Sequence, residues 1–102
     1  MRLITTKQAL VDSLGIVSRA ASSRSSIQVL AGVLIDAASE GTTISATDME
    51  ISLRCPLPGR VEEPGAAVVP ARILTEIARS IRGGEVVIEQ RAGESRAEIR
   101  AG

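Results

Sequence analysis

Carboxylates and one thiol are the first side chains to consider for chemistry, because the sequence contains no histidine. Asp48 and Glu50 form a close carboxylate pair, which in principle suits general acid–base chemistry or metal binding. Both residues fall beside a predicted turn, where acidic residues are common for conformational reasons alone. A second pair, Glu62 and Glu63, falls in a stretch rich in Pro and Gly. We therefore predict no catalytic residue and no metal site, and an enzyme ranks third among the hypotheses.

Two other features have structural explanations. Cys55 is the single cysteine and falls at an inward position of a predicted strand, with no second thiol or histidine to share a metal. A buried structural thiol that forms no disulfide is the expectation. The Gly83-Gly84 pair follows a predicted helix, whereas a phosphate-binding glycine loop precedes one. No cofactor is predicted.

Cations on the outer faces of two predicted helices, and in the serine-rich loop after the first, are more informative. Six cations stand there against two carboxylates, while the rest of the neutral chain holds six cations against ten. If both helices lie on one side of the sheet, that side attracts a polyanion. The alternative is that these arginines only solvate the helices and pair locally, as Glu76 and Arg79 can at i,i+3. The cations are Lys7, Arg19, Arg24, Arg72, Arg79 and Arg82, and the carboxylates are Asp12 and Glu76.

Hydrophobic periodicity predicts strand, helix and three strands in the first half. After a strand over residues 2–5, Thr5-x-x-Gln8 is a capping box that opens a helix over residues 6–21. The apolar run 27–37 predicts a central strand buried on both faces. Residues 42–57 alternate with period 2 around Thr47-Asp48 and predict a β-hairpin. The residues expected to face inward are Leu10, Val11, Leu14, Val17 and Ala21 in the helix, and Met49, Ile51, Leu53, Cys55 and Leu57 in the hairpin.

The second half repeats most of this order. Residues 59–65 are predicted to form a surface connection, followed by a strand over 66–69 and a helix over 71–82 that ends at the glycine pair. A hairpin over residues 85–101 turns at Ala92-Gly93. The fold class is therefore α+β, with two pseudo-symmetric β-α-β-β-β halves, two helices packed on antiparallel sheet, and the last strand expected to be missing. Inward positions are Ile73, Leu74, Ile77, Ala78 and Ile81 in the helix, and Val86, Ile88, Ala97 and Ile99 in the hairpin.

Length and composition set the broad class. The 102 residues suit one domain with one core, and the absence of Phe, Tyr and Trp requires an aliphatic core. No run approaches the roughly 18 apolar residues of a membrane span, and the N-terminal residues lack the order of a signal peptide. We expect no membrane association and a cytoplasmic location.

The order of elements, with VLAGVLIDA, GTTISATDMEISL and PGAAVVPARILTEIARSI, resembles the first domain of the bacterial sliding clamp, the beta subunit of DNA polymerase III. The resemblance covers essentially the whole chain. Its most specific pieces are Thr47-Asp48-Met49-Glu50, where the family typically has Thr-Asp-Leu-Glu, and Pro70-Ala71-Arg72 at the start of the second helix.

The resemblance implies a non-catalytic processivity factor of the replicative polymerase. Three such domains per subunit and two subunits per ring enclose double-stranded DNA, with helices lining the hole and sheets outside. The basic helical face then contacts phosphates without reading bases. Carried over by position, the DNA-contacting arginines fall on Arg24 and Arg72, with Arg79 at a further basic position. Helical geometry adds Arg82 and Arg19.

The chain also departs from a complete clamp subunit, which is more than three times as long. The pocket for polymerase and clamp-loader peptides belongs to later domains, and the strand that helps to form the homodimer interface is missing. We therefore expect residues 1–102 to be a single N-terminal clamp domain, a fragment of a three-domain subunit that forms no ring unaided. The rival hypothesis is a small protein-interaction module that pairs through an exposed sheet edge.

Overall fold

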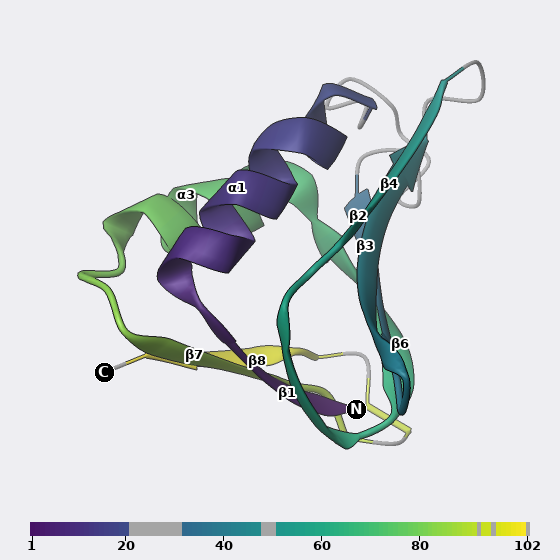
Figure 1. The fold of residues 1–102 in the computed structure, drawn as a ribbon, viewed down its shortest axis with the longest axis vertical. Helices are drawn as coiled ribbons and strands as arrows, with labels where there is room; N and C mark the ends of the chain where they lie inside the picture. The colour runs from purple at the N-terminus through teal and green to yellow at the C-terminus, as the bar shows by residue number, and fades with distance from the viewer. Residues whose placement is uncertain (21–31, 48–50, 92, 95, 102) are drawn as a thin grey trace.

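Two helices fill the angle between two four-stranded antiparallel sheets, as Figure 1 shows for this computed structural model. The structure describes residues 1–20, 32–47, 51–91, 93–94 and 96–101. In chain order the elements are β1 (Arg2–Thr6), α1 (Lys7–Val17), a 3-10 turn η1 (Ser18–Ala20), β2 (Gly32–Ala38), β3 (Gly41–Thr47), β4 (Ser52–Pro56), β5 (Gly59–Glu63), β6 (Gly65–Pro70), α3 (Ala71–Ser80), β7 (Glu85–Glu89) and β8 (Glu98–Ala101).

The predicted duplication is visible in the sheet topology. One sheet has the order β5-β1-β7-β8 and the other β4-β3-β2-β6. The first strand of each half joins the sheet of the other half: β1 pairs with β7, and β6 pairs with β2. The two halves are therefore interlocked, and the predicted α+β fold is confirmed.

The core is aliphatic, as the composition requires, and forms one cluster between the helices and the inner faces of both sheets. Alternate residues of the paired strands and every third or fourth residue of the helices point into it. Its largest fully buried side chains include Leu3, Leu10, Leu14, Ile35, Ile44, Leu57, Leu74 and Ile88.

The first helix begins one residue later than predicted. The side chain of Thr6, not Thr5, caps α1 by accepting a hydrogen bond from the backbone N–H of Ala9 at 3.2 Å. Thr5 is buried as an inward residue of β1, and its hydroxyl donates to the carbonyl oxygen of Pro58 at 2.7 Å. The α-helix ends at Val17 and tightens into η1, so the predicted extension to residue 21 is wrong for residues 18–20, and Ala21 lies outside the described residues.

The apolar run 27–37 is a central strand but not a doubly buried one. In β2, Val33 and Ile35 are fully buried, whereas Leu34 is 38% exposed on the outer face. The helices cover only one face of this sheet, so the alternate residues remain accessible to solvent. Residues 27–31 lie outside the described residues.

The hairpin over residues 42–57 is confirmed by the pairing of β3 with β4. Leu57 is buried and Leu53 is partly buried, as predicted. Ile51 is 56% exposed, contrary to prediction, because it precedes the first residue of β4 and escapes the alternation of the strand. Met49 lies outside the described residues.

Three predictions for the second half are wrong. Residues 59–63 form the edge strand β5, paired with β1, and are not merely a surface connection. The helix predicted to reach Arg82 ends at Ser80, because Ile81 has an extended backbone (φ −69°, ψ 137°). Ile73 was predicted to face inward but is 55% exposed, since Ala71, Leu74 and Ala78 form the buried stripe of α3. The strand β6 and the hairpin of β7 and β8 are confirmed.

Candidate nucleic-acid interface

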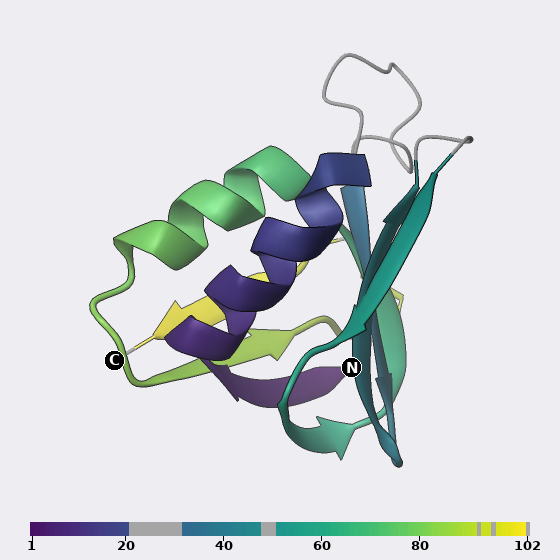
Figure 2. The same ribbon diagram turned by 45° about the horizontal axis from the view of Figure 1, so that its top comes forward.

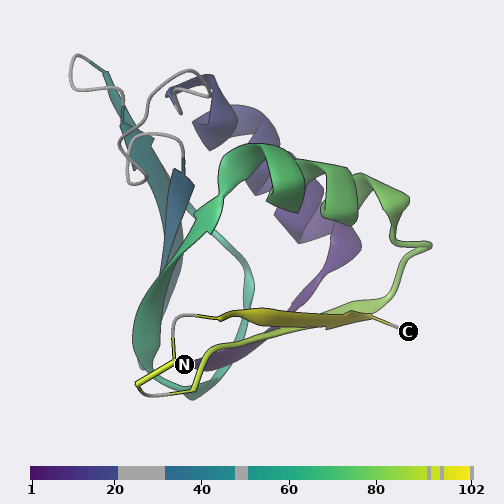
Figure 3. The same cartoon turned by 180° about the vertical axis from the view of Figure 1, so that it is seen from behind.

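The two helices lie side by side and run antiparallel, as Figures 2 and 3 show from two different sides. Lys7 at the start of α1 joins them. Its ammonium donates to the carbonyl oxygen of Arg79 at 3.3 Å, and its backbone N–H donates to the carbonyl oxygen of Gly84 at 3.2 Å. A small cavity of about 20 Å³ lies between the helices, lined in part by Gly15 and Thr75. The helices therefore present one continuous outer surface.

The exposed side of α3 is mostly polar, with Ile73 as an exposed apolar residue, whereas the opposite side is buried. Arg72, Glu76 and Arg79 are exposed, and at 100° per residue they lie within about 60° of one another around the helix. On α1 the corresponding exposed residues include Gln8 and Asp12. The amphipathic pattern thus fixes which side chains face away from the core. We call the outer surface of α1, η1, α3 and the loop after α3 the helical face.

The predicted DNA-binding residues have different outcomes. Arg72 and Arg79 are exposed on α3, as the periodicity predicts. Arg19 and Arg82 are also exposed, but the α-helical geometry used to place them is wrong. Arg19 lies in η1 and Arg82 lies beyond the end of α3. Arg24 lies outside the described residues, so its position stays a prediction.

Cations exceed carboxylates on the helical face. Arg72 forms the one ion pair seen there in the described part of the chain, with 3.6 Å between its Nε and Oε1 of Glu76. The alternative local pair of Glu76 with Arg79 is not formed. Within the described ranges, Arg19, Arg79 and Arg82 take part in no ion pair. Their charges remain available to an anionic partner.

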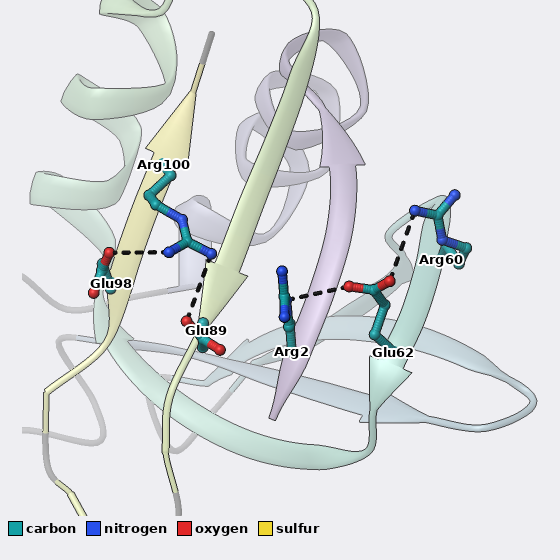
Figure 4. Close-up of polar contacts among 6 residues, drawn as sticks. All are labelled: Arg2, Arg60, Glu62, Glu89, Glu98 and Arg100. Atoms are coloured by element: carbon teal, nitrogen blue, oxygen red, sulfur yellow. Dashed lines mark hydrogen bonds and ion pairs between the residues drawn. The ribbon is translucent and has the colours of Figure 1, made fainter.

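The outer face of the β5-β1-β7-β8 sheet differs, because the arginines of its strands are ion-paired with carboxylates (Figure 4). Nε of Arg2 lies 3.1 Å from a carboxylate oxygen of Glu62. Arg100 lies 3.6 Å from Glu89 and 3.5 Å from Glu98. Arginines here neutralise their neighbours. A polyanion would therefore find more unpaired positive charge on the helical face than on this one.

Lys7 is a positioning residue that sequence reasoning did not identify. It was counted among the cations of the helical face, but its contact with α3 spans 72 residues of sequence. The sequence carries no signal for this contact, because only the packing of α1 against α3 brings the two groups together. The ammonium also lies at the C-terminal end of α3, where the helix dipole favours a cation.

The groups considered for catalysis or metal binding are not assembled into a site in the described parts of the chain. No group of three potential metal ligands occurs among those residues. Cys55 is partly buried, and its Sγ lies 3.8 Å from the carbonyl oxygen of Ser13. Glu62 is engaged with Arg2 and Arg60, and Asp48 and Glu50 lie outside the described residues. Neither described helix has the length and apolar character needed to cross a membrane.

Comparisons with known proteins agree on one family. The family model for the DNA polymerase III beta subunit, N-terminal domain, matches residues 1–102. The beta sliding clamp of Bacillus subtilis is 32% identical over 97 residues, which cover 87% of this chain and 26% of that protein. The beta sliding clamp homolog GriR of Streptomyces muensis is 35% identical over 79 residues, covering 78% of this chain and 21% of that protein.

The fold gives the same result. The crystal structure of the DNA polymerase sliding clamp from Caulobacter crescentus superposes with a TM-score of 0.93 at 29% identity, covering 100% of this chain and 28% of that one. The chain thus spans about a quarter of the length of the proteins that it matches. Since the family model, the relatives and the fold all agree, the chain belongs to the family of DNA polymerase III beta subunit N-terminal domains.

Proposed function

We propose that this chain acts as the first domain of a three-domain sliding-clamp subunit, whose homodimeric ring encloses duplex DNA and tethers the replicative polymerase. The observation that carries the proposal is the exposed helical face, on which Arg19, Arg79 and Arg82 have no ion-pair partner among the described residues. In this role the helical face lines the hole and contacts phosphates. Family membership supports the role, since the relatives are beta sliding clamps.

The position of Arg72 argues for a function beyond stability. Arg72 is the second residue of α3, and a cation there opposes the positive end of the helix dipole. Pro70 precedes the helix and has no side-chain oxygen with which to cap the first backbone N–H groups. A phosphate is favoured at such a terminus, and a nearby guanidinium adds a charge-assisted contact. A DNA phosphate at this end of α3 would thus compensate for the missing side-chain cap and for the unfavourable position of Arg72 in the first turn.

The role is topological and non-catalytic. Phosphate contacts hold DNA without reading its sequence, and enclosure by a ring provides persistence on the duplex. The polymerase and the clamp loader would bind through later domains of the subunit. The same proposal includes a cytoplasmic location for the protein and assembly of two subunits into a homodimeric ring.

The test is the salt dependence of duplex binding. Fluorescence anisotropy of a labelled duplex of about 20 base pairs would compare the chain with the double variant Arg72→Gln/Arg79→Gln. We expect weak binding that tightens as salt is lowered, with the double variant reducing the slope of log K against log salt by about two, roughly one per lost phosphate contact.

The control is Arg54→Gln, which also removes an exposed arginine, but from the outer side of β4. It should leave binding within error of the parent chain. Equal losses for Arg54→Gln and for the double variant would refute a phosphate surface confined to the helices. A duplex affinity that does not change with salt concentration would refute the phosphate mechanism itself.

A further inference from the structure

A carboxylate interrupts the basic stripe of α3. Arg72, Glu76 and Arg79 follow one another along the exposed side, with Glu76 about 6 Å of helix rise from Arg72 and about 4.5 Å from Arg79. On the neighbouring helix α1, Asp12 is exposed too, and its Oδ1 accepts a hydrogen bond from Gln8 at 2.8 Å. Because the helices are antiparallel, cations stand toward both ends of the helical face and carboxylates toward its middle.

Helix stability does not explain the pair of Arg72 with Glu76. The two side chains are 82% and 69% exposed, and exposed i,i+4 pairs contribute only about 0.3–0.5 kcal/mol. The order is also the weaker one, because a carboxylate placed N-terminal to its cation suits the helix dipole better than the reverse. The first turn of α3 contains no acidic residue to offset Arg72. The pair thus places a carboxylate beside a phosphate-facing arginine for little gain in stability.

The carboxylate competes directly with a phosphate. The Nε of Arg72 lies 3.6 Å from Oε1 of Glu76, so the carboxylate neutralises part of the guanidinium charge, and a phosphate that contacts the remaining N–H groups shares the cation with Glu76. Arg79 lies about two turns further along α3 and has no ion-pair partner among the described residues. The two arginines of α3 should therefore attract a phosphate to different extents. The charge of Arg72 is partly neutralised by Glu76, and that of Arg79 is not.

We propose that Glu76 limits the affinity of this surface for duplex DNA by holding the guanidinium of Arg72. This inference rests on the proposed function and adds a regulating residue to it. A surface that encloses DNA gains nothing from tight phosphate contacts, because each contact must break at every step of sliding. Glu76 weakens the contact between Arg72 and a phosphate, while the cation that attracts the duplex stays in place.

The experiment is a double-mutant cycle on duplex affinity, with the chain and the labelled duplex described above. Glu76→Gln keeps the size of the side chain and its hydrogen-bonding capacity but removes the charge. We expect it to tighten binding about two- to fivefold at low salt, the size of effect typical of an exposed ion pair. In the Arg72→Gln background the same change should have a much smaller effect, since no guanidinium is left to release.

Glu40→Gln is the matched control, because it removes one exposed carboxylate from the turn between β2 and β3. It tests whether net charge alone changes binding. Equal tightening by Glu40→Gln and Glu76→Gln would overturn the inference. An equal effect of Glu76→Gln with and without Arg72 would also overturn it, because the carboxylate would then repel phosphate directly.

The result also separates this inference from the function on which it rests. If Arg72→Gln and Arg79→Gln weaken binding while Glu76→Gln changes nothing, the phosphate surface stands and the role of Glu76 is wrong. If none of the arginine variants changes binding, the proposed function fails. Circular dichroism of each variant confirms that α3 is intact before affinities are compared.

Discussion

The ammonium of Lys7 donates a hydrogen bond to the carbonyl oxygen of Arg79, and so the first residue of α1 holds the last turn of α3. Replacing Lys7 with Met removes this contact and the cation at the C-terminal end of α3. We expect the last turn to fray, with faster hydrogen exchange at the backbone N–H of Ile81, which donates to Ile77 at 3.2 Å.

Global stability should change little, because Lys7 is also a cation at the start of α1, where the helix dipole disfavours it. Lys7→Arg, which can still donate to the carbonyl, should retain slow exchange at Ile81. Unchanged exchange at Ile81 in the Lys7→Met variant would show that the contact does not hold the turn.

Leu74 and Ile73 are neighbours with opposite environments. Leu74 is fully buried, and Leu74→Ala should cost about 2–5 kcal/mol of unfolding free energy through lost burial and a cavity. Ile73 is 55% exposed, so Ile73→Ala should change stability by only about 0.5 kcal/mol. Urea denaturation measures both, and comparable losses would mean that α3 buries a different face.

Gly15 and Gly59 should respond oppositely to substitution by alanine. Gly15 is an exposed residue of α1, and an added Cβ would meet no atom within 4 Å. Gly15→Ala should therefore stabilise the chain by about 0.5–1 kcal/mol. At Gly59 an added Cβ would overlap the carbonyl oxygen of Ile4 in β1, so Gly59→Ala should destabilise it. Thermal melts would contradict this account if both variants shifted in the same direction.

Arg24 provides a test beyond the described residues. The resemblance assigns it a phosphate contact, so Arg24→Gln should weaken duplex binding and lower the salt slope by about one. Arg54→Gln serves again as the control. A loss of affinity that persists equally at high salt would indicate an effect other than a lost phosphate contact.

Local periodicity accounts for much of what was predictable. The buried stripes of both helices follow from apolar residues three and four apart, which correctly placed Leu10, Leu14, Leu74 and Ala78 in the core. The same spacing put Arg72 and Arg79 on the exposed side. The spacing failed at Ile73, which lies at the margin of the apolar stripe of α3. Whether such a marginal residue is buried depends on the neighbouring element, which the local pattern does not reveal.

Contacts distant in sequence account for the failures. The strand β5 was missed because one partly buried apolar residue, Val61, gives no alternation, and its partner β1 is far away in the chain. The helix cap was placed on Thr5 because two threonines stand in succession. Thr5 is instead an inward residue of β1, hydrogen-bonded to the carbonyl oxygen of Pro58, and the side chain of Thr6 caps the helix.

The exchange of first strands between the two sheets also constrains how this chain folds as it is synthesised. β1 is made well before one of its two partners, β7, which ends at Glu89. A nascent chain that has released only the first half can form the β2-β3-β4 meander but not the complete β5-β1-β7-β8 sheet. Long-range pairing costs chain entropy before its contacts form, so residues through Glu89 must leave the ribosome before β1 can be paired on both edges in the β5-β1-β7-β8 sheet.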